Sequence, residues 1–466
     1  MSRSAHGYGN SLSSLCRRRI SFGKVRIGSL FFALCIATIA PPASAQSITL
    51  EELARKLEAV EKRNAELQAK ILKLESAQNA QAAQVQQQGQ AVERAQQTAN
   101  AASSASSATS WAANTTISSY GEIGYTRPTR APQNAQVDVG RAVIGITHRF
   151  DDSTRMVAEF EYEHAVTSAS DRGEAEVEQL YVEREFKNGL RAKAGLYLMP
   201  VGFLNQTHEP TAYYGVFRNF VETAIIPTTW REVGIGLSGT TEGALSWDVG
   251  LTTGFNLTKW DPASTEGRDG PLRATHGEGQ FAAARDLSAY GALNWRGIPG
   301  LHLGGSVFTG KVGHKTTDFL ANSSRLTLVD LHARYQFNGW DLSALYSRAT
   351  VSNTEELNTS FAVATPNPTL VPSRFYGGFV QAAYKLWQAQ DYLLYPFARY
   401  ERFNTAAGFG SLSTGNAGAE VRPDERVLTA GVSLRVGKGV VLKTDYQKFR
   451  TDASRDRFNI GMGYSF

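Results

Sequence analysis

From residue 116 to the end of the chain, apolar and polar residues alternate in short runs of about ten residues. In the clearest run, Leu245, Trp247 and Val249 are separated by Ser246 and Asp248. A period of two indicates β-strands with one apolar and one polar face. Because a tilted strand of about ten residues can cross a membrane, the pattern predicts an all-β, membrane-spanning fold for most of the chain.

The connections between these runs alternate between short and long. Sixteen candidate strands can be counted, near residues 116–126, 138–150, 154–164, 176–186, 190–199, 230–240, 244–256, 281–296, 301–310, 324–337, 340–350, 373–387, 392–404, 424–436, 440–450 and 457–466. Tight turns fall at 151–153, 187–189, 241–243, 297–300, 338–339 and 437–439, and longer loops include 200–229, 257–280, 351–372 and 405–423. Short turns on one side and long loops on the other predict a transmembrane antiparallel β-barrel of about 16 strands over residues 116–466.

Two places fit this interpretation poorly. Pro396 lies inside a candidate strand, although a proline in a central strand cannot donate to the ladder. From Glu178 to Phe186, charged and apolar residues occur on both faces. A shift of the strand boundaries by one residue there would exchange the two faces.

The last nine residues, Phe458–Phe466, alternate strictly between large apolar residues and Asn, Gly or Ser. Because the strand count is even, both ends of the array lie on the short-turn side. The last strand is therefore expected to pair with the first, near Ile117–Tyr125, and to close the sheet. Phe466 is then expected at the periplasmic interface, both as an aromatic-girdle residue and as a signal for the barrel assembly machinery.

The first 45 residues have the features of a secretory signal peptide. A basic segment, 17–26, precedes a short apolar run, 27–40, and the small residues Ala43, Ser44 and Ala45 form a cleavage site. Both cysteines and six of the 48 basic residues lie in this segment, which has no acidic residue. The remaining chain is close to neutral, so composition does not favour a nucleic-acid partner. We expect export to the outer membrane of a Gram-negative bacterium.

Residues 46–78 are predicted to form an α-helical coiled coil in the periplasm. The seam, spaced alternately by three and four residues, consists of Leu50, Leu53, Leu57, Val60, Asn64, Leu67, Ile71 and Leu74. Thr49 and Glu52 form a capping box, and Asn64 at an a position would fix register and oligomer number. The alternative is one amphipathic helix packed on a globular domain. Residues 79–115, rich in Ala, Gln and Ser, are expected to be a tether or a loose continuation of the helix.

The sequence has no complete catalytic or metal-binding motif, so we expect a protein that is not an enzyme and needs no cofactor. Gly234–Gly239 matches a dinucleotide fingerprint literally, but it lies in an alternating run with no helix after it. His208-Glu209 lacks the second histidine of a zinc protease, and the eight histidines show no metal-ligand spacing. A hydrolase with Ser and His on neighbouring strands remains an alternative that no local motif would reveal.

The loop at residues 200–229 is unusually rich in Phe, Tyr and Ile for a solvent-exposed connection. In a sixteen-stranded barrel it can bury these residues by folding inward, and this would narrow a lumen that is otherwise an open channel. The alternatives are an outward cap or a contact between protomers.

This loop and its flanks contain LMPVG (198–202), HEP (208–210), YGVFRN (214–219), IP (226–227) and WREVG (230–234). In these runs, beginning near Gly195, the chain resembles the phosphate-selective porin O/P family. The similarity spans residues 116–466 and leaves out the coiled coil, which is more reminiscent of trimeric porins for small dicarboxylates. The resemblance implies a homotrimeric, sixteen-stranded outer-membrane channel, constricted by a loop with basic residues, in which Arg218 contacts the solute.

Alternation alone turns several basic side chains toward the lumen: Arg141, Arg191, Lys193, Arg334, Arg399 and Lys443. Each could instead be a wall residue paired with a carboxylate, since Glu159, Glu161 and Glu163 face inward by the same count. We expect a porin in contact with outer-membrane lipid, through which phosphate or similar small anions diffuse passively. The alternative is a structural barrel that its coiled coil tethers toward the cell wall.

Overall fold

The structure, a computed structural model, describes residues 50–168, 170–410 and 421–466. The predicted signal peptide therefore lies outside the described residues. The described residues divide into two units, one that ends at residue 98 and one that begins at residue 99.

One continuous helix, α1 (Leu50–Ala113), covers most of the predicted coiled coil and tether. Its sequence is rich in Ala, Glu, Gln and Lys, which are good helix formers. No break in secondary structure separates the two predicted segments, so the tether residues as far as Ala113 continue the helix. Five residues of the predicted seam are 50–69% exposed in the single chain: Leu57, Val60, Leu67, Ile71 and Leu74. Among the described helices, none is both long and apolar enough to cross a membrane.

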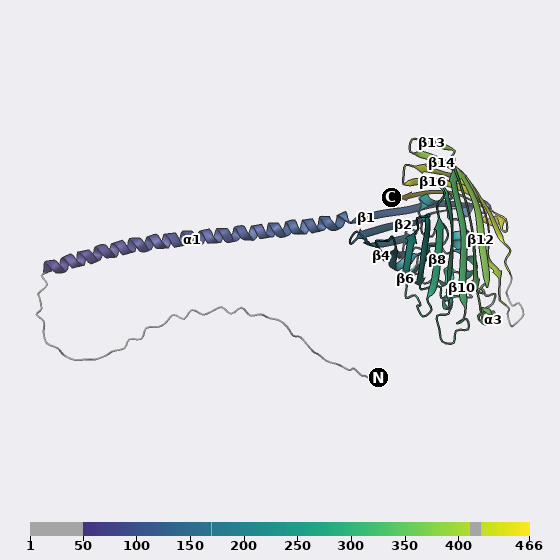
Figure 1. The fold of residues 1–466 in the computed structure, drawn as a ribbon, viewed down its shortest axis with the longest axis horizontal. Helices are drawn as coiled ribbons and strands as arrows, with labels where there is room; N and C mark the ends of the chain where they lie inside the picture. Colours follow the sequence, from purple (N-terminus) through teal and green to yellow (C-terminus); the bar gives the residue numbers. More distant parts are fainter. Residues whose placement is uncertain (1–49, 169, 411–420) are drawn as a thin grey trace. The chain divides into compact units, whose positions relative to one another are not determined.

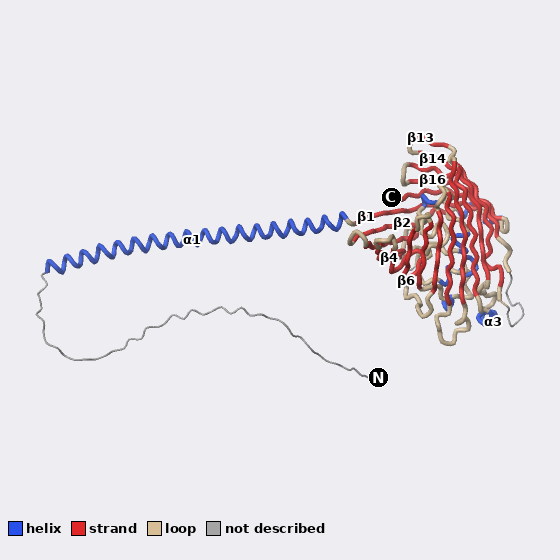
Figure 2. Tube along the Cα trace, viewed as in Figure 1, coloured by secondary structure: helices blue, strands red, loops and turns tan. Residues whose placement is uncertain are grey.

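The second unit contains one closed antiparallel sheet (Figures 1 and 2). Its strands are β1 (Thr115–Pro128), β2 (Gln136–Arg149), β3 (Thr154–Glu163), β4 (Ala175–Glu185), β5 (Arg191–Leu198), β6 (Arg231–Thr240), β7 (Leu245–Thr252), β8 (Ser288–Trp295), β9 (Leu301–Lys311), β10 (Arg325–Phe337), β11 (Trp340–Val351), β12 (Arg374–Tyr384), β13 (Trp387–Ala389), β14 (Tyr392–Gly408), β15 (Glu425–Val436), β16 (Val440–Phe449) and β17 (Arg457–Ser465). Because β12 and β13 both pair with β14, they form one stave, and the barrel has 16 staves, as predicted.

The last strand closes the barrel by pairing with the first. The register of β1 with β17 runs from Tyr120 opposite Ser465 to Pro128 opposite Arg457. Phe466 extends this pairing, because its N–H donates to the Ser119 carbonyl at 2.9 Å. The expected pairing of the chain ends is confirmed, and none of the described strands is left with a free edge.

The predicted boundaries differ from the observed ones mainly around the connection between β7 and β8. The strand expected at 244–256 ends at Thr252, and the one expected at 281–296 begins only at Ser288. The alternation of apolar and polar residues continues past the end of β7 and begins before the start of β8, where the chain is not paired in the sheet. At the first, Asn256 ends the extended run because its side chain accepts from the Thr258 N–H and caps a short helix, η4 (Leu257–Lys259).

Both misfits in the sequence pattern mark local irregularities of the sheet. Pro396 lies opposite the interruption between β12 and β13, where the ladder is already irregular. In β4, Glu178 is an extra residue, because Gln179 pairs with Glu159 whereas Val177 pairs with Phe160. This β-bulge turns two consecutive polar side chains inward and explains the mixed faces.

The remaining short helices lie in the connections. They are η1 (Pro132–Asn134), η2 (Pro210–Ala212), η3 (Val221–Ile225), α2 (Glu266–Asp269), η5 (Arg273–Thr275), α3 (Glu355–Ala364) and η6 (Ala453–Arg455). The connection that carries η2 and η3, residues 199–230, is called the inner loop below. It folds into the barrel, as predicted, and contacts inward-facing side chains of the wall.

Candidate functional site

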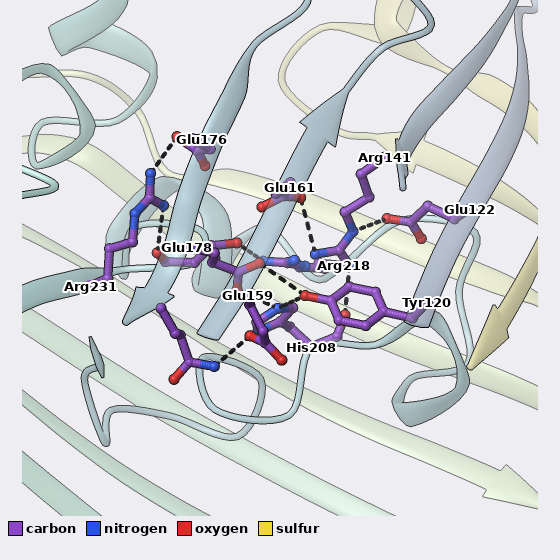
Figure 3. A network of polar contacts seen from close by, with 12 residues as sticks. Tyr120, Glu122, Arg141, Glu159, Glu161, Glu176, Glu178, His208, Arg218 and Arg231 are labelled. Carbon is purple, nitrogen blue, oxygen red and sulfur yellow. Dashed lines mark hydrogen bonds and ion pairs between the residues drawn. The ribbon is translucent and has the colours of Figure 1, made fainter. Parts of the chain in front are cut away.

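The carboxylate of Glu178, the extra residue in β4, binds the first part of the inner loop to the wall (Figure 3), and we call it the bulge carboxylate. The Nε2 atom of His208 lies 2.7 Å from Glu178, and the Tyr120 hydroxyl donates to the same carboxylate at 3.0 Å. The Arg141 guanidinium donates to the His208 carbonyl at 2.6 Å. Since a β-bulge re-aims a side chain, the extra residue in β4 is what brings this carboxylate under the loop.

Carboxylates from three other strands of the wall accept hydrogen bonds from the middle of the loop. The Tyr213 hydroxyl donates to Glu122 of β1 at 2.5 Å. The backbone N–H of Val216 donates to Asp445 of β16, and that of Phe220 to Glu401 of β14, both at 2.6 Å. The loop is therefore fixed by charge-assisted hydrogen bonds, which are stronger than neutral ones.

The middle of the loop crosses the seam between the first and last strands. A Cβ atom at Gly461 would lie 2.8 Å from Val216, and one at Gly463 would lie even closer to Pro210. A larger residue at either glycine would displace the loop. The small residues that alternate along the polar face of β17 thus make room for the loop.

The two ends of the loop pack into an apolar cluster inside the barrel. Trp230, which is 1% exposed, contacts Phe255 and Phe308 with ring centroids 4.9 and 4.6 Å apart. Its indole N–H donates to Glu232, so the ring carries no unsatisfied polar atom. The cluster also includes Met199, Val201, Val221, Ile225 and Ile226 of the loop and its flanks.

Beside the middle of the loop lies a cavity of about 600 Å³. It opens among residues of β1, β2, β17 and the loop, and we call it the basic cavity. Its basic lining residues are Arg141, Arg218, Lys443, Arg455 and Arg457, and its acidic ones are Glu122, Asp138 and Glu163. A cavity of this size can hold a small organic molecule.

Two of the five basic residues are neutralised by carboxylates. Arg141 lies 2.9 Å from Glu122 and 3.8 Å from Glu161, and Arg455 lies 3.2 Å from Glu425. Because both arginines form ion pairs within the protein, they contribute little net charge to the cavity.

The other three, Arg218, Arg457 and Lys443, have no ion pair among the described residues. Arg218 donates to the Thr229 hydroxyl at 3.1 Å, and Arg457 to the Gln447 side chain at 2.6 Å, so both partners are uncharged. The ammonium group of Lys443 is buried without a hydrogen-bond partner in the described part of the chain.

Aromatic rings stabilise positive charge on this trio, whereas burial and a neighbouring cation disfavour it. Lys443 Nζ lies 3.6 Å from the centroid of the Tyr213 ring, a cation–π contact. Partial burial, and then the nearby charge of Arg141, lower the pKa of Arg218. Since an arginine stays protonated in proteins, Arg218 and Arg457 present positive charge that an anion could neutralise.

The structure divides the residues predicted to line the constriction. Arg218, Arg141 and Lys443 lie together in the basic cavity. Arg191 begins β5 beside a short turn, opposite Glu185 and Ser238. It is not part of the basic cavity.

The other predicted residues face inward but form ion pairs within the wall. Lys193 lies 3.2 Å from Asp248. Arg334 lies 2.5 Å from Asp341. Arg399 lies 2.8 Å from Glu401. These three residues are therefore wall residues paired with carboxylates, which was the alternative interpretation of each.

Sequence reasoning missed Arg457, which lies one residue before the stretch that alternates most clearly. Continuing the alternation backward from Asn459 would have placed it on the lumen face. Among the described residues, no group of three or more His, Cys, Asp or Glu side chains is placed to bind a metal ion.

Comparisons with known proteins identify the fold but not a family. No family model matches the chain. An uncharacterized protein of Aquifex aeolicus is 28% identical over 359 residues, 75% of this chain and 80% of that protein. Salmonella typhi OmpF, solved in complex with daunomycin, aligns with a TM-score of 0.52 at 15% identity, over 76% of this chain and 97% of its own.

Two further solved structures are more distant. The outer membrane channel DcaP of Acinetobacter baumannii has a TM-score of 0.48 at 10% identity, over 76% of this chain and 97% of its own. The anion-selective porin from Comamonas acidovorans has a TM-score of 0.45 at 12% identity, over 76% and 100%. The likeness to OmpF shows that the second unit has the fold of a porin, a sixteen-stranded transmembrane β-barrel.

Proposed function

We propose that this protein is an outer-membrane porin that gives passive, anion-preferring diffusion to small solutes. The observation that carries the proposal is the trio Arg218, Arg457 and Lys443, which face one cavity without an ion pair among the described residues. A charged lining attracts ions of opposite sign, and weak binding at several sites lets them leave. Phosphate and similar anions are the proposed solutes, as the resemblance to the phosphate-selective porin O/P family suggests.

Reversal potentials in planar lipid bilayers under a KCl gradient test this function. The purified protein should conduct, and chloride should be more permeant than potassium. A barrel that does not conduct, or one that prefers potassium, would overturn the proposal. Swelling of liposomes in phosphate, dicarboxylates and sugars would then rank the solutes.

The proposal includes a location and partners. The barrel lies in outer-membrane lipid of a Gram-negative bacterium after removal of a signal peptide, residues 1–45, and forms a homotrimer. The helix lies in the periplasm, because β1 begins on the short-turn side of the barrel. Phe466 serves as the signal for the barrel assembly machinery. A Phe466→Asp variant that reaches the membrane as abundantly as the wild type would contradict that role.

A second candidate function is structural: a barrel tethered toward the cell wall. The exposed apolar seam of α1, which includes Leu57, Val60 and Leu67, favours it, because such a seam is buried when helices form a coiled coil. Deletion of residues 46–114 separates the two functions. If permeability survives and envelope integrity fails, tethering is the main role; if permeability is lost, the helix is needed by the channel.

A further inference from the structure

An exposed aromatic ring lies among the unpaired cations of the basic cavity. Phe217 is 37% exposed and lines the cavity next to Arg218. One part of the ring packs on the wall, since a Cβ atom at Gly124 would lie 3.5 Å from it. The guanidinium of Arg457 lies over the ring, 5.5 Å from its centroid. Water-filled channels are lined mainly by polar groups, so an exposed phenyl group at this place needs another explanation.

Further aromatic rings connect this position with the long-loop end of the barrel. Phe220 stacks on Phe403 with centroids 5.5 Å apart and meets the edge of Phe449 at 5.4 Å. Arg455 lies over the Phe449 ring at 4.5 Å, and it lines both the basic cavity and a second cavity of about 460 Å³. Aromatic faces and guanidinium groups therefore alternate along the approach to Arg218.

The two kinds of group recognise different parts of one solute. Guanidinium and ammonium groups bind a carboxylate, and Arg218 and Lys443 have unused donors for one. A ring of the solute could lie against Phe217, because aromatic pairs gain from offset or edge-to-face contact beyond the area that they bury. Inorganic phosphate would use the cations and leave the ring in water.

We propose that the basic cavity is a binding site for aromatic carboxylates, with Arg218 and Lys443 holding the carboxylate and Phe217 the ring. This inference rests on the proposed porin function and names the solute class of the same site. Benzoate is the simplest probe, with acetate as the same charge without a ring. An aromatic pair corresponds to about a fivefold preference for benzoate over acetate, or about 1 kcal/mol.

Block of the chloride current through single channels measures this preference as a ratio of half-blocking concentrations. The wild type should be blocked by benzoate at about one-fifth of the concentration needed for acetate. In Phe217→Ala the ratio should fall to about one. The matched control is Phe337→Ala on the outer face, where the side chain is 38% exposed, and it should keep the wild-type ratio. Phe217→Leu serves if the alanine variant does not fold.

The outcomes separate this inference from the proposed function. A channel that prefers chloride to potassium but is blocked equally by benzoate and acetate overturns the aromatic site and leaves the porin proposal standing. An unchanged ratio in Phe217→Ala does the same. A channel that prefers potassium overturns the porin proposal itself. Equilibrium dialysis of labelled benzoate against the purified barrel measures binding directly, without a conductance measurement. Equal retention of benzoate by the wild type and Phe217→Ala would refute the site.

Discussion

The ends and the middle of the inner loop are held by different forces. The ends, residues 199–204 and 221–230, contribute apolar side chains to a packed cluster that includes Trp230. The middle, residues 205–220, is held by wall carboxylates that accept hydrogen bonds from its backbone and side chains, as Glu122 does from Tyr213. Both parts lie inside the same barrel.

The difference separates anchoring from solute contact. Apolar packing at the ends is supplemented by Glu222, which accepts from the N–H groups of Phe203 and Leu204, and neither kind of contact consumes a lumen cation. In the middle, carboxylates of the wall accept hydrogen bonds from neutral groups of the loop, such as the Val216 N–H. The loop therefore keeps its own cation, Arg218, free of any ion pair in the described part of the chain.

Removing the apolar anchor should have the largest effect on stability. Trp230→Ala leaves a cavity beside Phe255 and Phe308, and should lower the free energy of unfolding by about 3–5 kcal/mol. Denaturant titration of the purified barrel measures the loss. Trp340→Ala, on the outer face where the side chain is 43% exposed, is the matched control and should cost clearly less. Equal losses would mean that the cluster does not anchor the loop.

Removing the bulge carboxylate should cost somewhat less and should act on the middle of the loop. Glu178→Ala leaves His208 and Tyr120 buried without their acceptor, at a cost of about 3 kcal/mol. Glu185→Ala, at the exposed end of the same strand, controls for the loss of a glutamate. Unfolding by denaturant measures both variants. If they unfold alike, the bulge does not hold the loop.

Loss of a single hydroxyl should have a smaller effect. Tyr213→Phe removes the hydrogen bond to Glu122 but keeps the ring under Lys443, so we expect a loss of about 1.5 kcal/mol. Tyr335→Phe on the outer face is the control, with a side chain that is 40% exposed. The same denaturant titration applies, and a Tyr213→Phe variant as stable as its control would show that packing alone fixes the middle.

Much of the barrel could be predicted from the sequence because alternation reports directly which face each residue occupies. Asn338 and Gly339 adopt positive φ values of 45° and 86° in the turn predicted between β10 and β11. The bulge at Glu178 disturbed the pattern without revealing its cause, since an extra residue exchanges the faces without changing the composition. A local irregularity was visible, but not its role in holding the loop.

The composition of the site could be predicted only in part. Alternation shows that Arg399 and Arg141 face inward, but not which carboxylates they meet. Arg399 meets Glu401, two residues along its own strand, whereas Arg141 meets Glu122 across a strand pair. These contacts depend on side-chain rotamers and on where the loop packs. The distinction between paired and unpaired cations therefore required the folded structure.

The smallest expected effect on stability accompanies the most informative effect on transport. Arg218→Ala removes no ion pair among the described residues and one hydrogen bond to Thr229, so we expect it to change the free energy of unfolding by less than about 1 kcal/mol. Arg191→Ala, at the start of β5 and outside the basic cavity, removes the same charge from another part of the barrel.

The reversal potential under a KCl gradient, compared among the wild type, Arg218→Ala and Arg191→Ala, tests the central claim most directly. We predict that the wild type prefers chloride, that Arg218→Ala loses most of this preference, and that Arg191→Ala retains it. Equal preferences in the two variants, or a wild type that prefers potassium, would contradict an anion path beside the inner loop.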